Sequence, residues 1–163
     1  MDEARRRARN DERLAELHPA FRRRVAAIVS ELERSGFRPR IQDAFRSDDA
    51  QAALHAKGAT KVRRGFHNLS GPRGPEALAA DVIDDDHPSS PSKGYLLALA
   101  RAADASRCRT GIRWGLPAPM VRALDAAIAS RDAATPVKIG WDPCHVEPAD
   151  VTLGAALRGE RPR

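Results

Sequence analysis

The nine residues Gly140–Pro148, GWDPCHVEP, place two carboxylates, a thiol and an imidazole within the six positions Asp142–Glu147. The whole chain has only five histidines and two cysteines. Carboxylate, thiolate and imidazole groups are the side chains that bind transition metals. A polar turn after a strand would also explain the stretch. It therefore indicates either such a turn or half of a metal site, and the second interpretation requires ligands elsewhere.

Two further residues are candidate ligands for the same ion as His145. A hydrolytic zinc site commonly takes three His, Asp or Glu ligands from different elements of the fold. His67 is expected at the end of an extended segment, and Asp81 lies inside the apolar strand 78–84, where a carboxylate needs a positive partner. A backbone hydrogen bond for His67 or an arginine for Asp81 are the alternatives. The other histidines are expected in helices or a solvated turn: His18, His55 and His87.

Length and charge favour one basic domain spanning residues 1–163. A chain of this size buries a core without disulfide bonds. The net charge of +6 comes mainly from arginine. Much of it lies at the two ends, RRRAR at 5–9 and RGERPR at 158–163, which are expected as flexible, solvated tails around a core at about 14–150.

The composition also limits the partners. A basic protein suits anionic partners such as nucleic acid, cell-wall polymer or a membrane surface. Aromatic residues make up 4% of the chain, too few for the stacking platforms of single-strand binding, so no specific nucleic acid is expected. No apolar run is long enough for a membrane span. We expect a monomer, cytoplasmic as synthesised because no signal peptide is visible, with release to the periplasm or cell wall, or carriage by a phage, left open.

The hydrophobic pattern predicts an α+β fold. The apolar spacing and turn residues indicate helices at 14–32, 47–58, 95–105 and 117–130 and strands at 40–45, 78–84, 110–115 and 136–147. A stretch rich in glycine and proline at 60–77 is expected as loop. Because helices and short strands do not alternate strictly, we expect a small, mostly antiparallel sheet flanked by helices. Free thiols are expected for the two cysteines, Cys108 and Cys144, unless the protein matures in an oxidising compartment.

Several short motifs, taken in order, carry a resemblance to a known family. They are FHN at 66–68, AAD at 79–81 and WDPCHVE at 141–147, preceded by a segment at 36–58. In this order the chain resembles the zinc D-alanyl-D-alanine carboxypeptidase and L-alanyl-D-glutamate peptidase family, which includes cell-wall peptidases, vancomycin-resistance dipeptidases and phage endolysins. The likeness runs from about residue 14 to residue 147.

The resemblance implies a Hedgehog/D,D-peptidase-like fold that holds one Zn²⁺ per chain. The implied metal ligands are His67, Asp81 and His145. Asp142 would be the general base, and Arg46 would be a second catalytic group that faces the developing oxyanion or a substrate carboxylate. The residues implied to bind substrate are Arg46, Ser47 and Gln51.

Strand alternation adds expectations for two neighbours of His145. Glu147 shares a strand face with His145 and could orient its imidazole. Cys144 points to the other face and is expected in the core. One departure from the family pattern concerns His67 and Asp81, which are fourteen residues apart, farther than usual. We interpret the extra length as a surface loop that leaves both ligands in place.

The predicted function is a zinc-dependent peptidase acting on peptidoglycan stem peptides, as a D,D-carboxypeptidase or an endolysin-like L-alanyl-D-glutamate endopeptidase. Three alternatives stay open at this point. The chain could be a non-catalytic wall- or partner-binding domain of the same fold, a basic nucleic-acid-binding protein in which DPCH is structural, or an amidohydrolase for a small dipeptide inside the cell.

Overall fold

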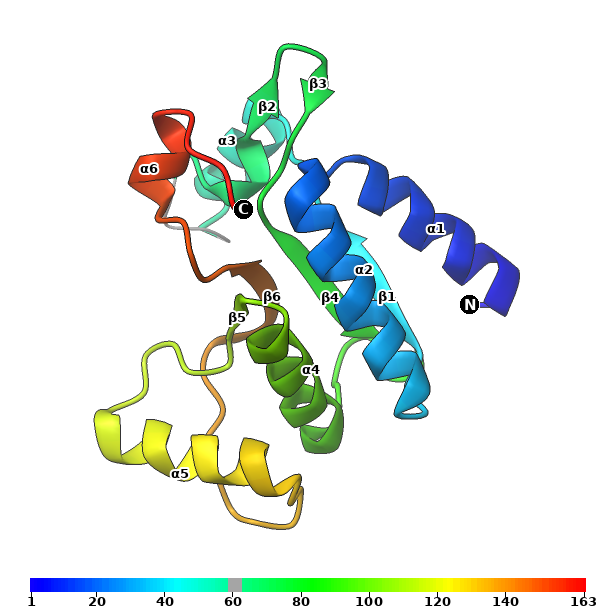
Figure 1. Ribbon diagram of the computed structural model, residues 1–163, viewed down its shortest axis with the longest axis vertical. Helices are drawn as coiled ribbons and strands as arrows, with labels where there is room; N and C mark the ends of the chain where they lie inside the picture. The colour runs from blue at the N-terminus through cyan, green and yellow to red at the C-terminus, as the bar shows by residue number, and fades with distance from the viewer. Residues whose placement is uncertain (59–62) are drawn as a thin grey trace.

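A four-stranded antiparallel sheet forms the centre of the computed structural model, which describes residues 1–58 and 63–163 (Figure 1). The strand order is β1-β4-β6-β5. The bounds of these strands are Pro39–Asp43 for β1, Ala80–Asp84 for β4, Cys108–Gly111 for β5 and Asp142–Pro148 for β6. The predicted α+β class with a small antiparallel sheet between helices is confirmed.

The pairing of the two central strands decides which residues meet. In the β4–β6 register, Asp81 lies opposite His145 and Ala80 lies opposite Val146. Ala80 and Val146 are fully buried in the hydrophobic core. Since neighbouring residues in a strand point to opposite faces, Asp81 and His145 point away from that core. The sheet therefore brings two predicted ligands together on its other face.

Two helices cover the core side of the sheet. They are α2 (Pro19–Arg34) and α4 (Lys93–Ala105), which lie side by side in Figure 1. The apolar stripe of α2 is fully buried, as its helical spacing predicts. The Tyr95 hydroxyl of α4 donates a 3.0 Å hydrogen bond to the Val82 carbonyl and so ties α4 to β4.

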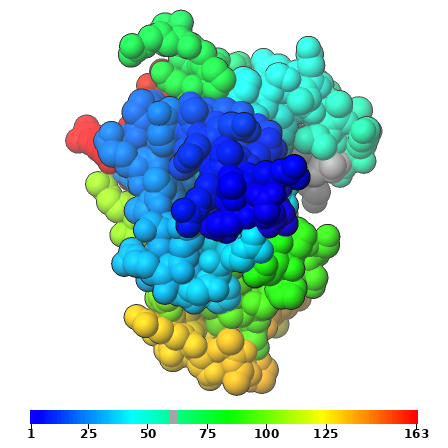
Figure 2. Space-filling view, turned by 90° about the vertical axis from the view of Figure 1, so that its right-hand side faces the viewer, coloured from blue at the N-terminus to red at the C-terminus, as the bar shows by residue number. Residues whose placement is uncertain are grey.

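The arginine-rich start of the chain is a docked helix and not a solvated tail. Helix α1 (Glu3–Ala15) lies against β1, and in Figure 2 it forms the dark blue front of the molecule. Arg6 is 2% exposed and donates to the Pro39 carbonyl at 2.5 Å. The Asn10 side chain donates a hydrogen bond to the Pro39 carbonyl and accepts one from the Ile41 amide. These polar side chains form hydrogen bonds with the backbone of the edge strand β1 and leave no apolar pattern in the sequence. The prediction of a solvated tail was therefore wrong here.

Two predicted strands are shorter in the structure. The strand predicted at 110–115 is β5, which ends at Gly111, where the Trp114 amide donates to the Gly111 carbonyl and closes a turn. The strand predicted at 136–147 begins only at Asp142. The helix predicted from residue 14 begins at Pro19, because proline suits the first helical turn. The end of the chain is also partly packed, since Pro162 is buried.

The remaining elements are short or peripheral. Their bounds are Asp48–Ala56 for α3, Phe66–Asn68 for the 3₁₀ helix η1, Ser70–Gly71 for β2, Gly74–Pro75 for β3, Ala118–Ser130 for α5 and Leu153–Leu157 for α6. The hairpin of β2 and β3 projects from the top of the molecule in both views (Figures 1 and 2). Among the helices of the described residues, none has the length and apolar character needed to cross a membrane.

Candidate metal centre

Three predicted ligands converge on one point beside the sheet. His145 Nδ1 lies 3.2 Å from Asp81 Oδ1, and His67 Nε2 lies 3.6 Å from the same oxygen. One donor atom from each of the three residues lies within 4.8 Å of the other two. His67 and His145 are buried, and Asp81 is half-buried. The cluster could hold a metal ion.

His67 reaches the cluster from a turn and not from the extended segment that the sequence predicts. The η1 turn is closed by Asn68, whose side-chain oxygen accepts from the Gly65 amide at 2.9 Å. The amide nitrogen of Asn68 donates to the Arg46 carbonyl at 2.8 Å, and the Arg46 amide donates to the His67 carbonyl at 2.9 Å. These bonds fix η1 to the segment between β1 and α3, so the His67 backbone has a defined position.

The β2–β3 hairpin accounts for the long spacing between His67 and Asp81. Its two strands pair Ser70 with Pro75 and Gly71 with Gly74. At its base the chain closes again, because the backbone after the hairpin hydrogen-bonds the backbone before it. The hairpin lies outside the sheet (Figure 1). The longer spacing thus leaves both ligands in reach of each other, as predicted.

The hydrogen bonds of the two imidazoles select the nitrogen that each presents to Asp81. His67 Nδ1 lies 2.5 Å from the Ala44 carbonyl, which can only accept, so Nδ1 carries the proton and Nε2 offers a lone pair. His145 Nε2 lies 3.1 Å from a Glu147 oxygen, which likewise leaves the lone pair on Nδ1. Both lone pairs face the Asp81 carboxylate. Neutral imidazoles in this arrangement repel the carboxylate unless a proton or metal cation lies between them.

Two of the three separations between the donor atoms are close to those of zinc ligands, and the two imidazole nitrogens lie within 4.8 Å of each other. Tetrahedral ligands at the usual zinc distances of about 2.0–2.2 Å are about 3.3–3.6 Å from one another. The observed separations of 3.2 and 3.6 Å bracket that range. Two imidazoles and one carboxylate are also a common donor set for a site that keeps a fourth position for solvent.

The electrostatics of the cluster favour a cation. Burial alone would lower the pKa of His145, but its hydrogen bonds to Asp81 and Glu147 outweigh burial and raise that pKa to about 9. For Asp81, burial would raise the pKa, but the hydrogen bonds from His145 and His67 hold it well below its usual value. The carboxylates thus attract positive charge strongly enough to protonate a buried imidazole. A divalent ion satisfies the same demand.

Glu147 makes the contact with His145 that strand spacing predicts. Its other carboxylate oxygen accepts a 2.7 Å hydrogen bond from Arg109 Nε, which lies opposite Glu147 on β5. Burial raises the pKa of Glu147, but the bonds to His145 and Arg109 outweigh it and lower the pKa. Glu147 is therefore an anion that can fix the tautomer and orientation of His145.

Asp142 lies next to the cluster but is not one of the three residues that could share an ion. It begins β6 opposite Gly111 and is half-buried. Burial is the main reason why its pKa is raised. Smaller electrostatic effects on Asp142 come from the surrounding site residues His145, Asp81, His67 and Arg46.

Arg46 is brought to the same place by a network of short contacts. Its guanidinium donates to Asp43 Oδ2 at 2.6 and 3.1 Å and to Gln51 Oε1 at 2.9 Å. One nitrogen also lies 3.7 Å from the second oxygen of Asp81. Arg46 therefore places positive charge beside a candidate ligand.

The other two residues predicted to bind substrate have structural contacts. The Ser47 hydroxyl caps α3 by accepting from the Ala50 amide at 3.2 Å, and Gln51 is 2% exposed beside Arg46. Their role in substrate binding stays a prediction. Cys144 packs partly buried against the core, as alternation predicts, and both cysteines are free.

Sequence reasoning gave no role to the two tryptophans. The Trp114 ring lies 5.2 Å from the His145 ring and 5.0 Å from the Trp141 ring, measured between centroids. The available signal was their rarity, since the chain has only two and one of them directly precedes Asp142.

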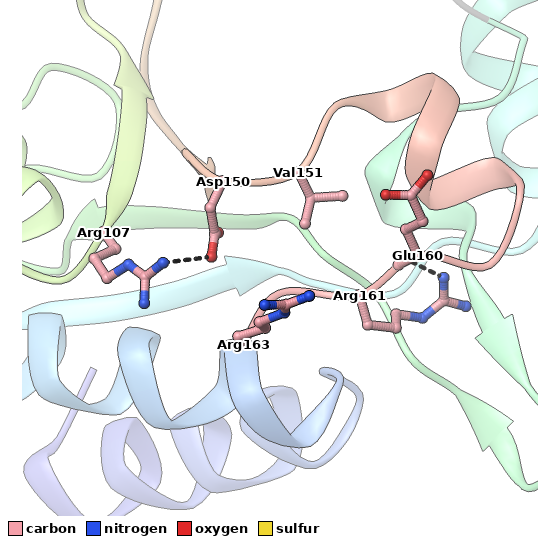
Figure 3. A pocket seen from close by; sticks show the side chains of 6 residues that line it. All are labelled: Arg107, Asp150, Val151, Glu160, Arg161 and Arg163. Atoms are coloured by element: carbon pink, nitrogen blue, oxygen red, sulfur yellow. Dashed lines mark hydrogen bonds and ion pairs between the residues drawn. The ribbon is translucent and has the colours of Figure 1, made fainter.

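A separate cavity of about 460 Å³ lies at the C-terminal end (Figure 3). Its lining residues are Arg107, Asp150, Val151, Glu160, Arg161 and Arg163. Figure 3 shows the Arg107 guanidinium against the Asp150 carboxylate, at 3.2 Å. The cavity shares no residue with the candidate metal cluster, and two of its cations, Arg107 and Arg161, pair with the carboxylates of Asp150 and Glu76.

Comparison with known proteins supports the fold independently. No protein-family model matches the chain, and no curated protein matches its sequence. The structure is similar to the crystal structure of the Serratia marcescens L-Ala D-Glu endopeptidase ChiX, with a TM-score of 0.53. The two chains are 19% identical over 86% of each.

The chain shares its overall fold with that structure. At this level of identity the likeness concerns the arrangement of helices and strands, and it confirms the predicted D,D-peptidase-like architecture.

Proposed function

We propose that the chain is a zinc-dependent peptidase that hydrolyses an amide bond in the stem peptides of peptidoglycan. The observation that carries the proposal is the cluster of His67, Asp81 and His145, whose donor atoms lie within 4.8 Å of one another and could hold a metal ion, in a fold similar to that of an endopeptidase. One Zn²⁺ per chain would be held by these three residues. When bound there, zinc would supply Lewis acidity toward a water molecule and toward the carbonyl of the scissile amide.

The residues around the ligands support the chemistry of an amide hydrolase. The Ala44 carbonyl and the Glu147 carboxylate hold each imidazole with an unprotonated nitrogen toward Asp81. Such outer contacts commonly tune metal affinity and ligand orientation. In the proposed site, these groups would orient the ligands.

Asp142 is the proposed general base. It lies beside the cluster without belonging to it, and burial raises its pKa, which makes its carboxylate a better proton acceptor. In the proposed reaction Asp142 removes a proton from the attacking water. It then returns that proton to the leaving amine, acting as base and later as acid.

Arg46 is the proposed electrostatic partner of the substrate. Its guanidinium lies 3.7 Å from Asp81 and is held in place by Asp43 and Gln51. A fixed positive charge there would stabilise negative charge that develops on the carbonyl oxygen, or hold a substrate carboxylate. We propose that Ser47 and Gln51 contribute to the same side of the substrate site.

The substrate class follows from the family resemblance and from charge. The structurally similar protein is described as an L-Ala D-Glu endopeptidase. The net charge of +6 would attract an anionic cell wall. Both an L-alanyl-D-glutamate endopeptidase, as in an endolysin, and a D,D-carboxypeptidase fit the proposed chemistry.

Digestion of purified peptidoglycan tests the proposal. Zinc-loaded protein is incubated with the polymer, and new termini are identified by mass spectrometry. New D-glutamyl amino termini indicate the endopeptidase, whereas release of D-alanine indicates the carboxypeptidase. Stoichiometric zinc without cleavage of any stem peptide would instead favour a non-catalytic wall-binding domain.

A further inference from the structure

An exposed indole stands at the rim of the candidate metal centre. Trp141 is 72% exposed, although tryptophan usually buries most of its large apolar surface. Its ring lies 5.0 Å from Trp114, whose ring lies 5.2 Å from the His145 imidazole. The rings of Trp141, Trp114 and His145 are therefore in consecutive contact, from the solvent-exposed surface to a candidate metal ligand.

The backbone is built to hold the two rings together. The Gly140 amide donates to the Ile112 carbonyl at 2.7 Å, which joins the segment before Trp141 to the segment before Trp114. A Cβ at Gly140 would lie only 2.6–2.7 Å from carbonyl and amide atoms of that neighbouring segment. Only glycine permits this approach, so the tryptophan pair rests on a fixed scaffold.

A second glycine makes room for the exposed ring. Gly115 has a φ of +75°, which favours glycine, and a Cβ there would lie 3.2 Å from the Trp141 ring. The turn that carries Trp114 therefore also shapes the surface beneath Trp141. An indole held in this way, yet left exposed, offers a flat apolar face to a ligand.

We infer that the Trp114–Trp141 pair binds the sugar ring that carries the stem peptide, an inference that rests on the proposed function. The residues of a stem peptide are small or charged and offer little flat apolar surface. A pyranose ring presents a broad face of C–H groups that can lie against an indole. Stacking on an aromatic face is the recognition mode that an exposed, rigid tryptophan provides.

The length of the stem peptide relates a sugar on Trp141 to the bond that is cut. The sugar is joined to the stem through its L-alanine, and an extended chain advances about 3.5 Å per residue. The L-alanyl-D-glutamate bond is therefore about one residue from the sugar attachment, and the D-alanyl-D-alanine bond is about four residues away, roughly 14 Å. Trp114 lies between Trp141 and His145, with ring centroids 5.0 Å from Trp141 and 5.2 Å from His145. The two separations set an upper limit of about 10 Å between the Trp141 and His145 rings, which lies between the two peptide lengths, so the choice of bond is left to the digestion experiment.

Intrinsic fluorescence can test the binding step, because Trp114 and Trp141 are the only tryptophans in the chain. The protein is titrated with the disaccharide of N-acetylglucosamine and N-acetylmuramic acid, which has no peptide bond to cleave. We expect a saturable change in emission that Trp141→Ala abolishes and Trp141→Tyr largely retains. Leu157→Ala, a change at another exposed apolar residue, should behave as wild type. The absence of a saturable change in wild type, or unchanged binding by Trp141→Ala, would overturn the inference.

Kinetics separate this inference from the proposed function. The ratio of kcat/KM for a disaccharide-linked stem peptide to that for the free peptide should be about tenfold in wild type, the scale of one aromatic contact, and near one in Trp141→Ala. Equal rates for both substrates in wild type would refute sugar binding and leave the peptidase intact. Saturable disaccharide binding without cleavage of either peptide would refute the proposed peptidase activity and support sugar binding by the Trp114–Trp141 pair.

Discussion

Two clusters of charged residues in this molecule differ in how their charges are matched. At the C-terminal end, Asp150 is met by Arg24 at 2.7 Å and by Arg107 at 3.2 Å, so the carboxylate has its cations. At the candidate metal centre, Arg46 lies 3.7 Å from one oxygen of Asp81, but the other oxygen is met by the nitrogens of two imidazoles that are neutral unless protonated. The first cluster is complete as it stands and ties parts of the fold together. In the second, two nitrogen lone pairs face a carboxylate oxygen, so the cluster is complete only with a proton or a metal ion, as expected of a candidate metal site.

The largest expected effect is the loss of zinc from the incomplete cluster. His145→Ala should reduce zinc from about one per chain to none and reduce hydrolysis by about a thousandfold or more, because it removes a ligand. Zinc content by mass spectrometry and hydrolysis of a stem peptide measure both effects. Excess zinc should also stabilise the wild type, by about 4 kcal/mol when free zinc is a thousand times its Kd.

The matched control for this change is Arg107→Ala in the complete cluster. That variant should keep its zinc and its activity, since Arg107 touches no residue of the metal centre. If His145→Ala bound zinc as wild type does, the three-residue site would be refuted.

The second effect concerns catalysis without loss of metal. Asp142→Asn should keep zinc but reduce kcat by about 10²–10⁴, the usual contribution of a general base. Steady-state kinetics with a stem peptide, together with metal analysis, separate the two readouts. Asp86→Asn, a change at an exposed carboxylate paired with Arg38, serves as control. A normal kcat in Asp142→Asn would remove Asp142 as the base.

The third effect is on metal affinity. Glu147→Gln should weaken zinc binding by about 10- to 100-fold, because the amide holds the His145 tautomer less firmly than a carboxylate does. Competition with a chelator of known affinity measures the change. Arg109→Ala, which removes only the partner of Glu147, should weaken binding less. Equal affinity in wild type and Glu147→Gln would show that the contact with His145 does not tune the metal.

Much of the candidate metal centre could be predicted from the sequence because its strands carry local signals. The apolar run at 78–84 predicts a buried strand, and Asp81 is a carboxylate in the middle of this run, where an apolar residue would be expected. The DPCH motif then supplies a histidine at the position that pairs with Asp81. Both signals depend on residues close in sequence, so they are visible without the fold.

Other features depend on contacts that sequence patterns do not show. The turn at His67 is held by bonds to Arg46, twenty-one residues earlier. Helix α1 docks through Arg6 and Asn10, whose polarity suggested a solvated tail. The strand predicted at 136–147 begins only at Asp142, after Gly140, which packs on the turn before Trp114. In each case a long-range hydrogen bond or close approach overrides the local pattern.

The smallest expected effect belongs to the complete cluster and depends on pH. The hydrogen bond from Arg24 lowers the pKa of Asp150 to about 2, below the usual value of about 4 for an unfolded aspartate. A carboxyl whose pKa is lowered in the folded state stabilises the protein above the unfolded value, and this contribution is lost as the pH falls from about 4 toward 2. Asp150→Asn should therefore lower the free energy of unfolding by about 0.5–1 kcal/mol at pH 7, the scale of a surface ion pair.

The difference between wild type and Asp150→Asn should shrink as the pH is lowered through that window. Urea unfolding of both proteins at pH 7, 4 and 3 measures it, and zinc content at pH 7 should be equal in the two. A difference that stays constant from pH 7 to 3 would mean that packing, and not the charge of Asp150, stabilises this end of the chain. A loss of zinc in Asp150→Asn would mean that the two clusters are coupled, against the separation that their contacts indicate.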